Sequence, residues 1–256
     1  MQYLLIILCL VIGRFPILIT IATIFIAGEF YGIQSSFIST LAVLCVIIFS
    51  IILTLLISKL LSKTILKGLP SSFVLELPPY RKPQIGKILI RSIFDRTLFV
   101  LLRAIKASAP AGLVIWLLAN INISGISLLT LIANFLNPFA QLMGLDGYIL
   151  IAFILGMPAN EIVLPIMLMA YLKTNTLIDT DDLFYISQIL NQNGWTIITA
   201  INVMLFTVLH FPCLTTLLTI KKETNSIKWT FLSFIIPTFC GIIICMFTNL
   251  VYNLII

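Results

Sequence analysis

The sequence predicts an all-α fold: a polytopic bundle of transmembrane helices with about six or seven spans, two of them broken by proline, plus one amphipathic interfacial helix. Of its 256 residues, 61% are hydrophobic and only 9% are charged, whereas a soluble domain carries about 25% charged residues. The apolar residues form runs close to the roughly 20 residues that a helix needs to cross a bilayer. We therefore expect a multi-pass membrane protein without a separate soluble domain.

The distribution of charge predicts which side of the bundle faces the cytoplasm. Ten of the fifteen Lys and Arg residues lie between Lys59 and Lys106, and positive residues gather on the cytoplasmic side of membrane proteins. The net charge of +6 thus marks one side of a lipid bilayer. We expect no nucleic-acid partner.

The apolar runs divide the chain into three predicted units. Residues 1–61 hold two spans. Residues 62–108 form a proline-rich connector followed by an amphipathic helix, whose six charges occupy about half of the helix circumference. Residues 109–256 hold the remaining spans, which are predicted at 126–143, 148–171, 195–220 and 229–256 after the helix that ends near residue 121. The 126–143 segment is short, so a thin crossing and a re-entrant helix both stay open.

The central apolar run contains the first predicted break, Gly156-Met157-Pro158-Ala159-Asn160-Glu161, followed by Pro165. A carboxylate in the middle of a span is costly and calls for a functional explanation. Proline frees the carbonyl four residues earlier, and a free carbonyl at membrane depth must face protein or a wet cavity. The stretch therefore predicts a permeation or binding site. The alternative is a kinked helix whose Glu161 is paired with a neighbour.

A second break is predicted at His210-Phe211-Pro212-Cys213, where Pro212 leaves the carbonyl of Val208 without its helical partner. If local helix persists, His210 and Cys213 share a face. Imidazole, thiolate and carboxylate suit a borderline divalent transition ion better than Mg²⁺ or Ca²⁺. The alternative is that His210 and Cys213 only pack and form hydrogen bonds.

Arg14, just before Phe15 and Pro16, interrupts the first apolar run. It predicts either a helix break that faces the bundle interior or an arginine that extends to the headgroups. The sequence contains no phosphate-binding loop and none of the motifs GxSxG, HExxH or GxGxxG. With one histidine and no catalytic constellation, the chain is not expected to be an enzyme.

These residues also resemble a known family. Glu76-Leu77-Pro78-Pro79-Tyr80-Arg81 is similar to the ELPPYR motif in the membrane half of FeoB-type ferrous iron transporters. Trp116, the 156–161 stretch, the 210–216 stretch with Thr215 and Thr216, and Lys222-Glu223-Thr224 follow in the family's order. Gly13-Arg14-Phe15-Pro16 looks like the end of the first of the family's two Gate domains, so residues 1–61 would be the remnant of that domain and 109–256 the second one.

The resemblance implies Fe²⁺ transport across the bacterial cytoplasmic membrane, with Pro212-Cys213 and Glu161 matching Gate motifs. The family's GTP-binding domain and its early Gate segment have no counterpart in this sequence, so we expect a split or truncated system in which this chain binds no nucleotide. A separately encoded GTP-binding and early-Gate part is then an expected partner, together with a small FeoA-type protein, and a homo-oligomer is left open.

The expected metal site and permeation path follow from the breaks and the resemblance together. The expected metal-handling residues are Glu161, Cys213, His210, Met157 and Asn160. The expected path and gate residues are Arg14, Pro16, Gly156, Pro158, Pro165, Pro212, Thr215 and Thr216. A Gate-type permease for another small, nucleoside-like solute and a scaffold subunit that transports nothing are the alternatives.

Overall fold

The computed structural model describes residues 14–28, 33–64, 97–123, 125–180 and 182–255, together with residues 86, 90, 91 and 94. The motif at 76–81 and most of the predicted amphipathic helix at 85–108 lie outside these residues. The proposed division into units at 61 and 108 therefore stays a prediction.

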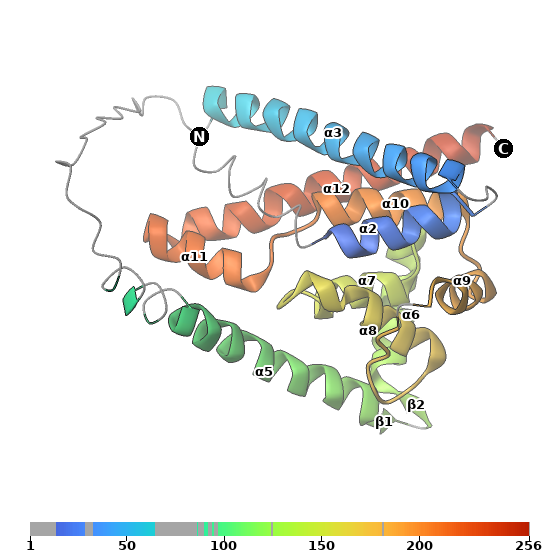
Figure 1. The fold of residues 1–256 in the computed structure, drawn as a ribbon, viewed down its shortest axis with the longest axis horizontal. Helices are drawn as coiled ribbons and strands as arrows, with labels where there is room; N and C mark the ends of the chain where they lie inside the picture. The colour runs from blue at the N-terminus through green and yellow to red at the C-terminus, as the bar shows by residue number, and fades with distance from the viewer. Residues whose placement is uncertain are drawn as a thin grey trace.

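The described part is almost entirely helical, which agrees with the predicted fold class (Figure 1). Before the centre of the chain come α2 (Phe15–Ile21), a π-helical turn η1 (Ala22–Ile26), α3 (Ile33–Thr64) and α5 (Phe99–Asn120). A two-stranded antiparallel hairpin, β1 (Asn122–Ile123) and β2 (Ile126–Ser127), follows. The second half contains α6 (Leu128–Leu142), α7 (Gly147–Leu155), a 3₁₀ turn η3 (Asn160–Ile162), α8 (Val163–Leu172), α9 (Leu183–Gln192), α10 (Ile197–Leu209), α11 (Leu214–Thr224) and α12 (Ile227–Ile255).

Three stretches of the described residues are long and apolar enough to cross a membrane: Gln34–Leu61, Ile197–Thr224 and Ile227–Ile255. The pair α6 and α7 adds a fourth if it counts as one span, although its two helices are bent by 109°. The short 126–143 segment thus belongs to a bent pair. The central run is broken, as predicted, into α7 and α8, and α7 packs against both α6 and α8. The predicted six or seven crossings are not established by these helices.

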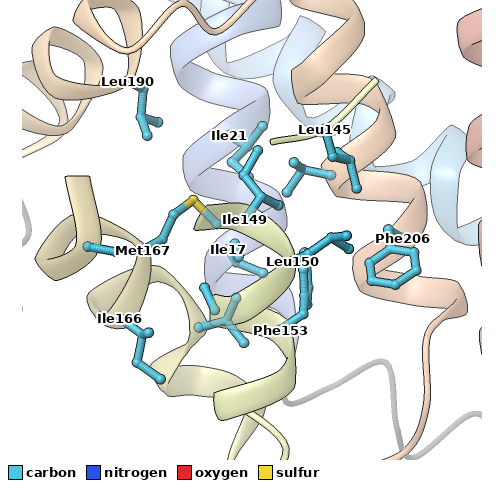
Figure 2. Close-up of a cluster of buried hydrophobic side chains, with 14 of the residues drawn as sticks. Ile17, Ile21, Leu145, Ile149, Leu150, Phe153, Ile166, Met167, Leu190 and Phe206 are labelled. Atoms are coloured by element: carbon cyan, nitrogen blue, oxygen red, sulfur yellow. The ribbon is translucent and has the colours of Figure 1, made fainter. Parts of the chain in front are cut away.

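The buried core lies among the short helices α2, α7, α8 and α10. Figure 2 shows Ile17 and Ile21 of α2 facing Ile149, Leu150 and Phe153 of α7. The side chains of Ile166 and Met167 from α8 and Phe206 from α10 complete this cluster. By contrast, α3, α5 and α12 expose many large apolar side chains. Apolar outer helices around a packed interior are the arrangement that lipid requires, because lipid solvates apolar side chains.

The turn between α6 and α7 is held by side chains from α10 and α12. Asn202 Nδ2 donates to the carbonyl of Met143 over 2.9 Å, and the Thr248 hydroxyl donates to Asn202 Oδ1. Asn249 Nδ2 donates to the carbonyls of Gln141 and Leu142 over 3.1 and 3.2 Å. The last carbonyls of a helix have no partner within it, and inside a membrane they need one from elsewhere. The polar residues on α10 and α12 therefore fix the bend between α6 and α7.

Gly144 in this turn offers a test, because its φ is +67° and a Cβ there would lie 2.5 Å from Asn202 Nδ2. We expect Gly144→Ala to lower the free energy of unfolding by about 1–3 kcal/mol through backbone strain and the loss of the Asn202 contact. Gly194→Ala is the matched control, since Gly194 has φ +79° but open space around its Cβ position. Thermal melts of the two purified variants should differ; equal melting temperatures would show that the Asn202 contact contributes nothing.

Candidate functional site

The predicted second break is present between α10 and α11. Helix α10 ends at Leu209, His210 has ψ 179°, and Cys213 has φ −61° and ψ 157° before α11 begins at Leu214. The backbone is therefore extended from His210 to Cys213, with Pro212 inside the break. Because this stretch is not helical, the condition for His210 and Cys213 to share a helical face is not met.

The carbonyls freed by this break are taken up by Arg14. Its Nη1 donates to the carbonyl oxygens of Thr207 and Val208 over 2.6 and 2.9 Å, and Nη2 donates to that of Phe211 over 2.9 Å. The prediction that Pro212 leaves the Val208 carbonyl without its helical partner is thus confirmed, and that partner is replaced by a guanidinium. One planar cation thus connects the start of α2 to two carbonyls in the last turn of α10 and one in the break, nearly 200 residues away in the chain.

The burial of Arg14 decides between its two interpretations. The side chain is only 1% exposed, so the interpretation that it extends to the headgroups is wrong. The physical reason is that the carbonyls accept hydrogen bonds from both terminal nitrogens of the guanidinium inside the bundle. Pro16 lies in the first turn of α2, where a missing N–H costs little. Arg14 therefore marks a helix start that faces the bundle interior.

His210 packs as a core aromatic residue in this structure. It is 2% exposed, and its ring lies 4.9–5.5 Å, centroid to centroid, from those of Phe153, Phe206 and Phe211. Its Nδ1 lies 2.9 Å from the carbonyl oxygens of Phe206 and Thr207, which requires the proton on Nδ1. In the described part of the chain its Nε2 has no hydrogen-bond partner. The structure thus favours the packing alternative for His210.

Cys213 lies with the two threonines that follow it. Its Sγ is 3.1 Å from the hydroxyl oxygens of both Thr215 and Thr216, and the side chain is half-buried. Residues 213, 215 and 216 therefore form one polar cluster at the start of α11. Soft sulfur and hard hydroxyl oxygen beside each other suit a borderline ion such as a first-row divalent transition metal.

The first break meets this cluster through the backbone. Helix α7 ends at Leu155, residues 156–159 form a turn, and α8 begins at Val163 after the η3 turn. The N–H of Leu214, at the start of α11, donates to the carbonyl oxygen of Met157 over 2.9 Å. The Met157 carbonyl, at the first break, thus accepts a hydrogen bond from the first N–H of α11, the helix that follows the second break. The sequence-predicted breaks come together at this bond.

Gly156 and the two prolines have different roles in the first break. A Cβ at Gly156 would lie 2.3 Å from Val163 Cγ2, so the turn needs glycine to let α7 and α8 approach. Pro158 lies within the turn itself. Pro165, however, lies in the first turn of α8, where proline is tolerated. The expectation that Pro165 disturbs the helix is therefore not met.

Glu161 and Asn160 face a separate cavity. They line it together with Pro16, Thr20, Asp179 and other residues, and Cys213 and His210 are not among its lining residues. Among the described residues, no three His, Cys, Asp or Glu side chains are grouped closely enough to hold a metal ion. The expected five-residue metal set is thus not gathered at one point in this conformation.

Sequence reasoning missed two features of this region. Trp195 Nε1 donates to the Tyr171 hydroxyl over 2.7 Å, and that hydroxyl donates to Asp146. This chain of hydrogen bonds fixes α8 to the start of α7. The other feature is the position of Asp179, which lines the same cavity as Glu161. Neither feature has a signal in the local sequence, because each brings together residues that are distant in the chain.

Two family models match the sequence. The model described as "Ferrous iron transport protein B C terminus" covers residues 43–95, and the model described as "Nucleoside recognition" covers residues 101–227. A protein named "Fe(2+) transporter FeoB" from Staphylococcus aureus is 30% identical over 215 residues, which is 81% of this chain. The chain belongs to the FeoB family and is similar to the C-terminal portion of its members.

Other FeoB relatives agree with this placement. Proteins of the same name from Synechocystis and Leptospira interrogans are both 27% identical, over 64% and 65% of this chain. The chain spans about a third of the length of the Staphylococcus FeoB, 31%, and 26% of each of the other two. No solved structure matches the chain.

Proposed function

We propose that this chain is the membrane-embedded conducting part of a FeoB-type ferrous iron transport system in the bacterial cytoplasmic membrane, with Fe²⁺ as its cargo. The observation that carries the proposal is the bond between the Met157 carbonyl and the Leu214 N–H. It joins two unwound segments beside the thiol of Cys213. Discontinuous helices that meet inside a bundle are typical of transporter ion sites.

The hydrogen bonds at the junction limit which groups can contact the ion. The carbonyls of Thr207, Val208 and Phe211 are occupied by Arg14, and that of Met157 by Leu214. Cys213, Thr215 and Thr216 then supply the nearest side-chain donors, and water completes the shell. Such a mixed, incomplete shell binds weakly enough for an ion to leave again, as conduction requires.

The proposed system includes parts that this chain does not supply. We propose a GTP-binding and early-Gate part as its partner, because the chain corresponds to only 31% of the Staphylococcus relative, and a small FeoA-type protein as a further partner. In this arrangement the chain binds no nucleotide and crosses the membrane about six or seven times.

Uptake by the reconstituted chain tests this function. Proteoliposomes that contain the chain and its GTP-binding partner should accumulate Fe²⁺ under anaerobic conditions. Cys213→Ser should reduce the rate on the order of tenfold or more, since loss of a metal-site partner commonly costs 10–100-fold. Cys240→Ser is the matched control, because Cys240 is a half-buried thiol on α12 and its rate should not change. Equal rates of Fe²⁺ uptake by the two variants would show that Cys213 is not part of the permeation path.

A nucleoside-like solute is the second candidate, favoured by the description of the family model at residues 101–227. A thermal-shift screen of nucleosides against Fe²⁺ and Mn²⁺ separates the two candidates. A nucleoside that stabilises the unmodified chain and the Cys213→Ser variant equally would favour the nucleoside-like solute. Binding of the GTP-binding part without uptake of either solute would instead favour the scaffold alternative.

A further inference from the structure

Three aromatic side chains and one carboxylate meet at the end of the buried core that lies away from the two breaks. Trp195 Nε1 donates to the Tyr171 hydroxyl over 2.7 Å, and this hydroxyl donates to Asp146 Oδ2. The ring of Trp195 also stacks on that of Phe25, with 5.5 Å between the ring centroids and 24° between the planes. We call this chain of contacts, Asp146–Tyr171–Trp195–Phe25, the clamp.

Each member of the clamp belongs to a different core helix. Asp146 is the N-cap of α7, Tyr171 lies in the last turn of α8, Trp195 comes two residues before α10, and Phe25 lies in the turn η1 that continues α2. At their other ends, α7 and α8 flank the first break, α10 leads into the second, and Arg14 before α2 binds the second. The clamp and the breaks therefore lie at opposite ends of the same helices.

The hydrogen bonds of the clamp run in one direction. An indole N–H only donates, so the Tyr171 oxygen accepts from Trp195 and its single proton goes to Asp146. The other oxygen of Asp146, Oδ1, accepts from the N–H of Ile149 over 2.7 Å and so caps α7. One carboxylate thus holds both its own helix and the end of α8, and one hydroxyl joins α8 to α10.

The clamp is a buried connection between the α7–α8 pair and α10. Tyr171 and Trp195 are only 8% and 6% exposed, so water competes little for their hydrogen bonds. Helix α10 packs most closely on α12, α3 and α2. Its side chains reach α7 where Phe206 lies edge to face on Phe153, with ring centroids 5.0 Å apart. The clamp supplies a further fixed point at the far end.

We propose that Tyr171 is a positioning residue for the junction of the two breaks: its hydroxyl holds α8 and α10 in the alignment that brings the Met157 carbonyl to the Leu214 N–H. Helix α10 has 13 residues, so the clamp acts over about 20 Å at 1.5 Å per residue. A displacement at one end reaches the other because closely packed interiors transmit strain. The alignment stands alone, whereas its role in transport rests on the proposed function.

The reactivity of Cys213 reports this alignment from the other end of the helices. Cys213 is half-buried beside the junction, and Cys45 is an exposed thiol on α3 that serves as internal reference. The full chain in detergent is labelled with N-ethylmaleimide, and mass spectrometry follows each thiol. Tyr171→Phe removes one oxygen atom and with it both hydrogen bonds of the clamp. It should raise the labelling rate of Cys213 relative to Cys45 about threefold or more, since local opening controls access to a half-buried group.

Two control variants separate positioning from general stability. Tyr148→Phe removes a hydroxyl that forms no hydrogen bond with the described residues, from a ring 5.5 Å, centroid to centroid, from that of Tyr171. It should leave the labelling ratio unchanged. Leu129→Ala removes a buried side chain of α6, away from the clamp. It should lower the melting temperature without changing the ratio.

Trp195→Phe is a milder variant that tests the clamp even if Tyr171→Phe fails to fold. It keeps a ring against Phe25 and removes only the N–H, so it should raise the labelling ratio less than Tyr171→Phe does. Adding Trp195→Phe to Tyr171→Phe should raise the ratio no further, because the bond between the two side chains is already lost.

Fe²⁺ uptake by proteoliposomes that also contain the GTP-binding partner tests the role in transport. Tyr171→Phe should lower the maximal rate on the order of tenfold, since misalignment at a functional site is costly. The Fe²⁺ concentration that gives half of the maximal rate should not change, because Tyr171 does not contact the ion.

Two results would overturn the proposal: a labelling ratio in Tyr171→Phe or Trp195→Phe that equals the ratio in Tyr148→Phe, or an equal rise in Leu129→Ala. These results are distinguishable from failure of the proposed function. A raised ratio in Tyr171→Phe, without Fe²⁺ uptake by the unmodified chain, would keep the positioning role and remove the transport function. Uptake by the unmodified chain with equal labelling ratios would do the reverse.

Discussion

Arg14→Met is expected to yield a chain that melts at a much lower temperature and no longer supports Fe²⁺ uptake. The substitution keeps a long side chain but removes the Arg14 donors to the carbonyls of Thr207, Val208 and Phe211, of which only that of Thr207 keeps another donor, His210 Nδ1. If each of the two orphaned carbonyls, those of Val208 and Phe211, costs about 1 kcal/mol, the free energy of unfolding falls by about 2 kcal/mol. No other group bonds these three carbonyls to α2 in the described structure, so the break should lose its shape.

Two control variants separate geometry from charge in this experiment. Arg14→Lys keeps the positive charge but not the planar fork that reaches three acceptors, so it should recover only part of the stability. Lys221→Met removes an exposed positive charge from α11 and should change neither melting nor uptake. If the Arg14→Met chain melted at the same temperature as the unmodified protein, the three hydrogen bonds would not be what holds the break.

The sequence was sufficient to predict features that arise within a few residues. Pro212 had to free the Val208 carbonyl, because the loss of a proline N–H acts four residues earlier in the same helix. The identity of the group that fills this gap could not be predicted. Arg14 is separated from its acceptors by more than 190 positions, and no local pattern connects them. Long-range pairing of this kind is decided by how the helices pack.

The same limit explains the positions of Glu161 and Cys213. Helical periodicity predicts direction only while the helix continues, and Glu161 lies in a 3₁₀ turn just after the break. A short turn rotates every later side chain by an amount that the sequence does not state. The structure consequently has Glu161 at the wall of a cavity that Asp179 also lines, whereas the prediction grouped it with Cys213.

The predicted number of crossings rested on apolar runs, which measure composition and not direction. The run from 148 to 171 is long enough for one span, yet it contains two helices, α7 and α8. Among the described helices, the one that together with α7 is long and apolar enough to cross the membrane is α6. Gly144, with its positive φ, and the asparagines that contact the turn decide this bend. Their role depends on α10 and α12, which are distant in sequence.

The central claim is that the two helix breaks act as one site, joined by the Met157 carbonyl and the Leu214 N–H. Leu214→Pro removes this N–H with little other change, because proline is favoured at the first position of a helix. The residue before it, Cys213, already has the extended conformation that proline requires, with φ −61° and ψ 157°. Leu214→Ala is the matched control, since it loses the side chain but keeps the N–H.

Fe²⁺ uptake by proteoliposomes that contain the Leu214→Pro chain and its GTP-binding partner, compared with Leu214→Ala, is the most direct measurement. Without the bond, the two breaks can shift relative to each other, and small misplacements at a functional site are costly. We expect uptake on the order of tenfold lower in Leu214→Pro than in Leu214→Ala. Equal uptake by the two variants would contradict the account, because transport would then not depend on the junction of the breaks.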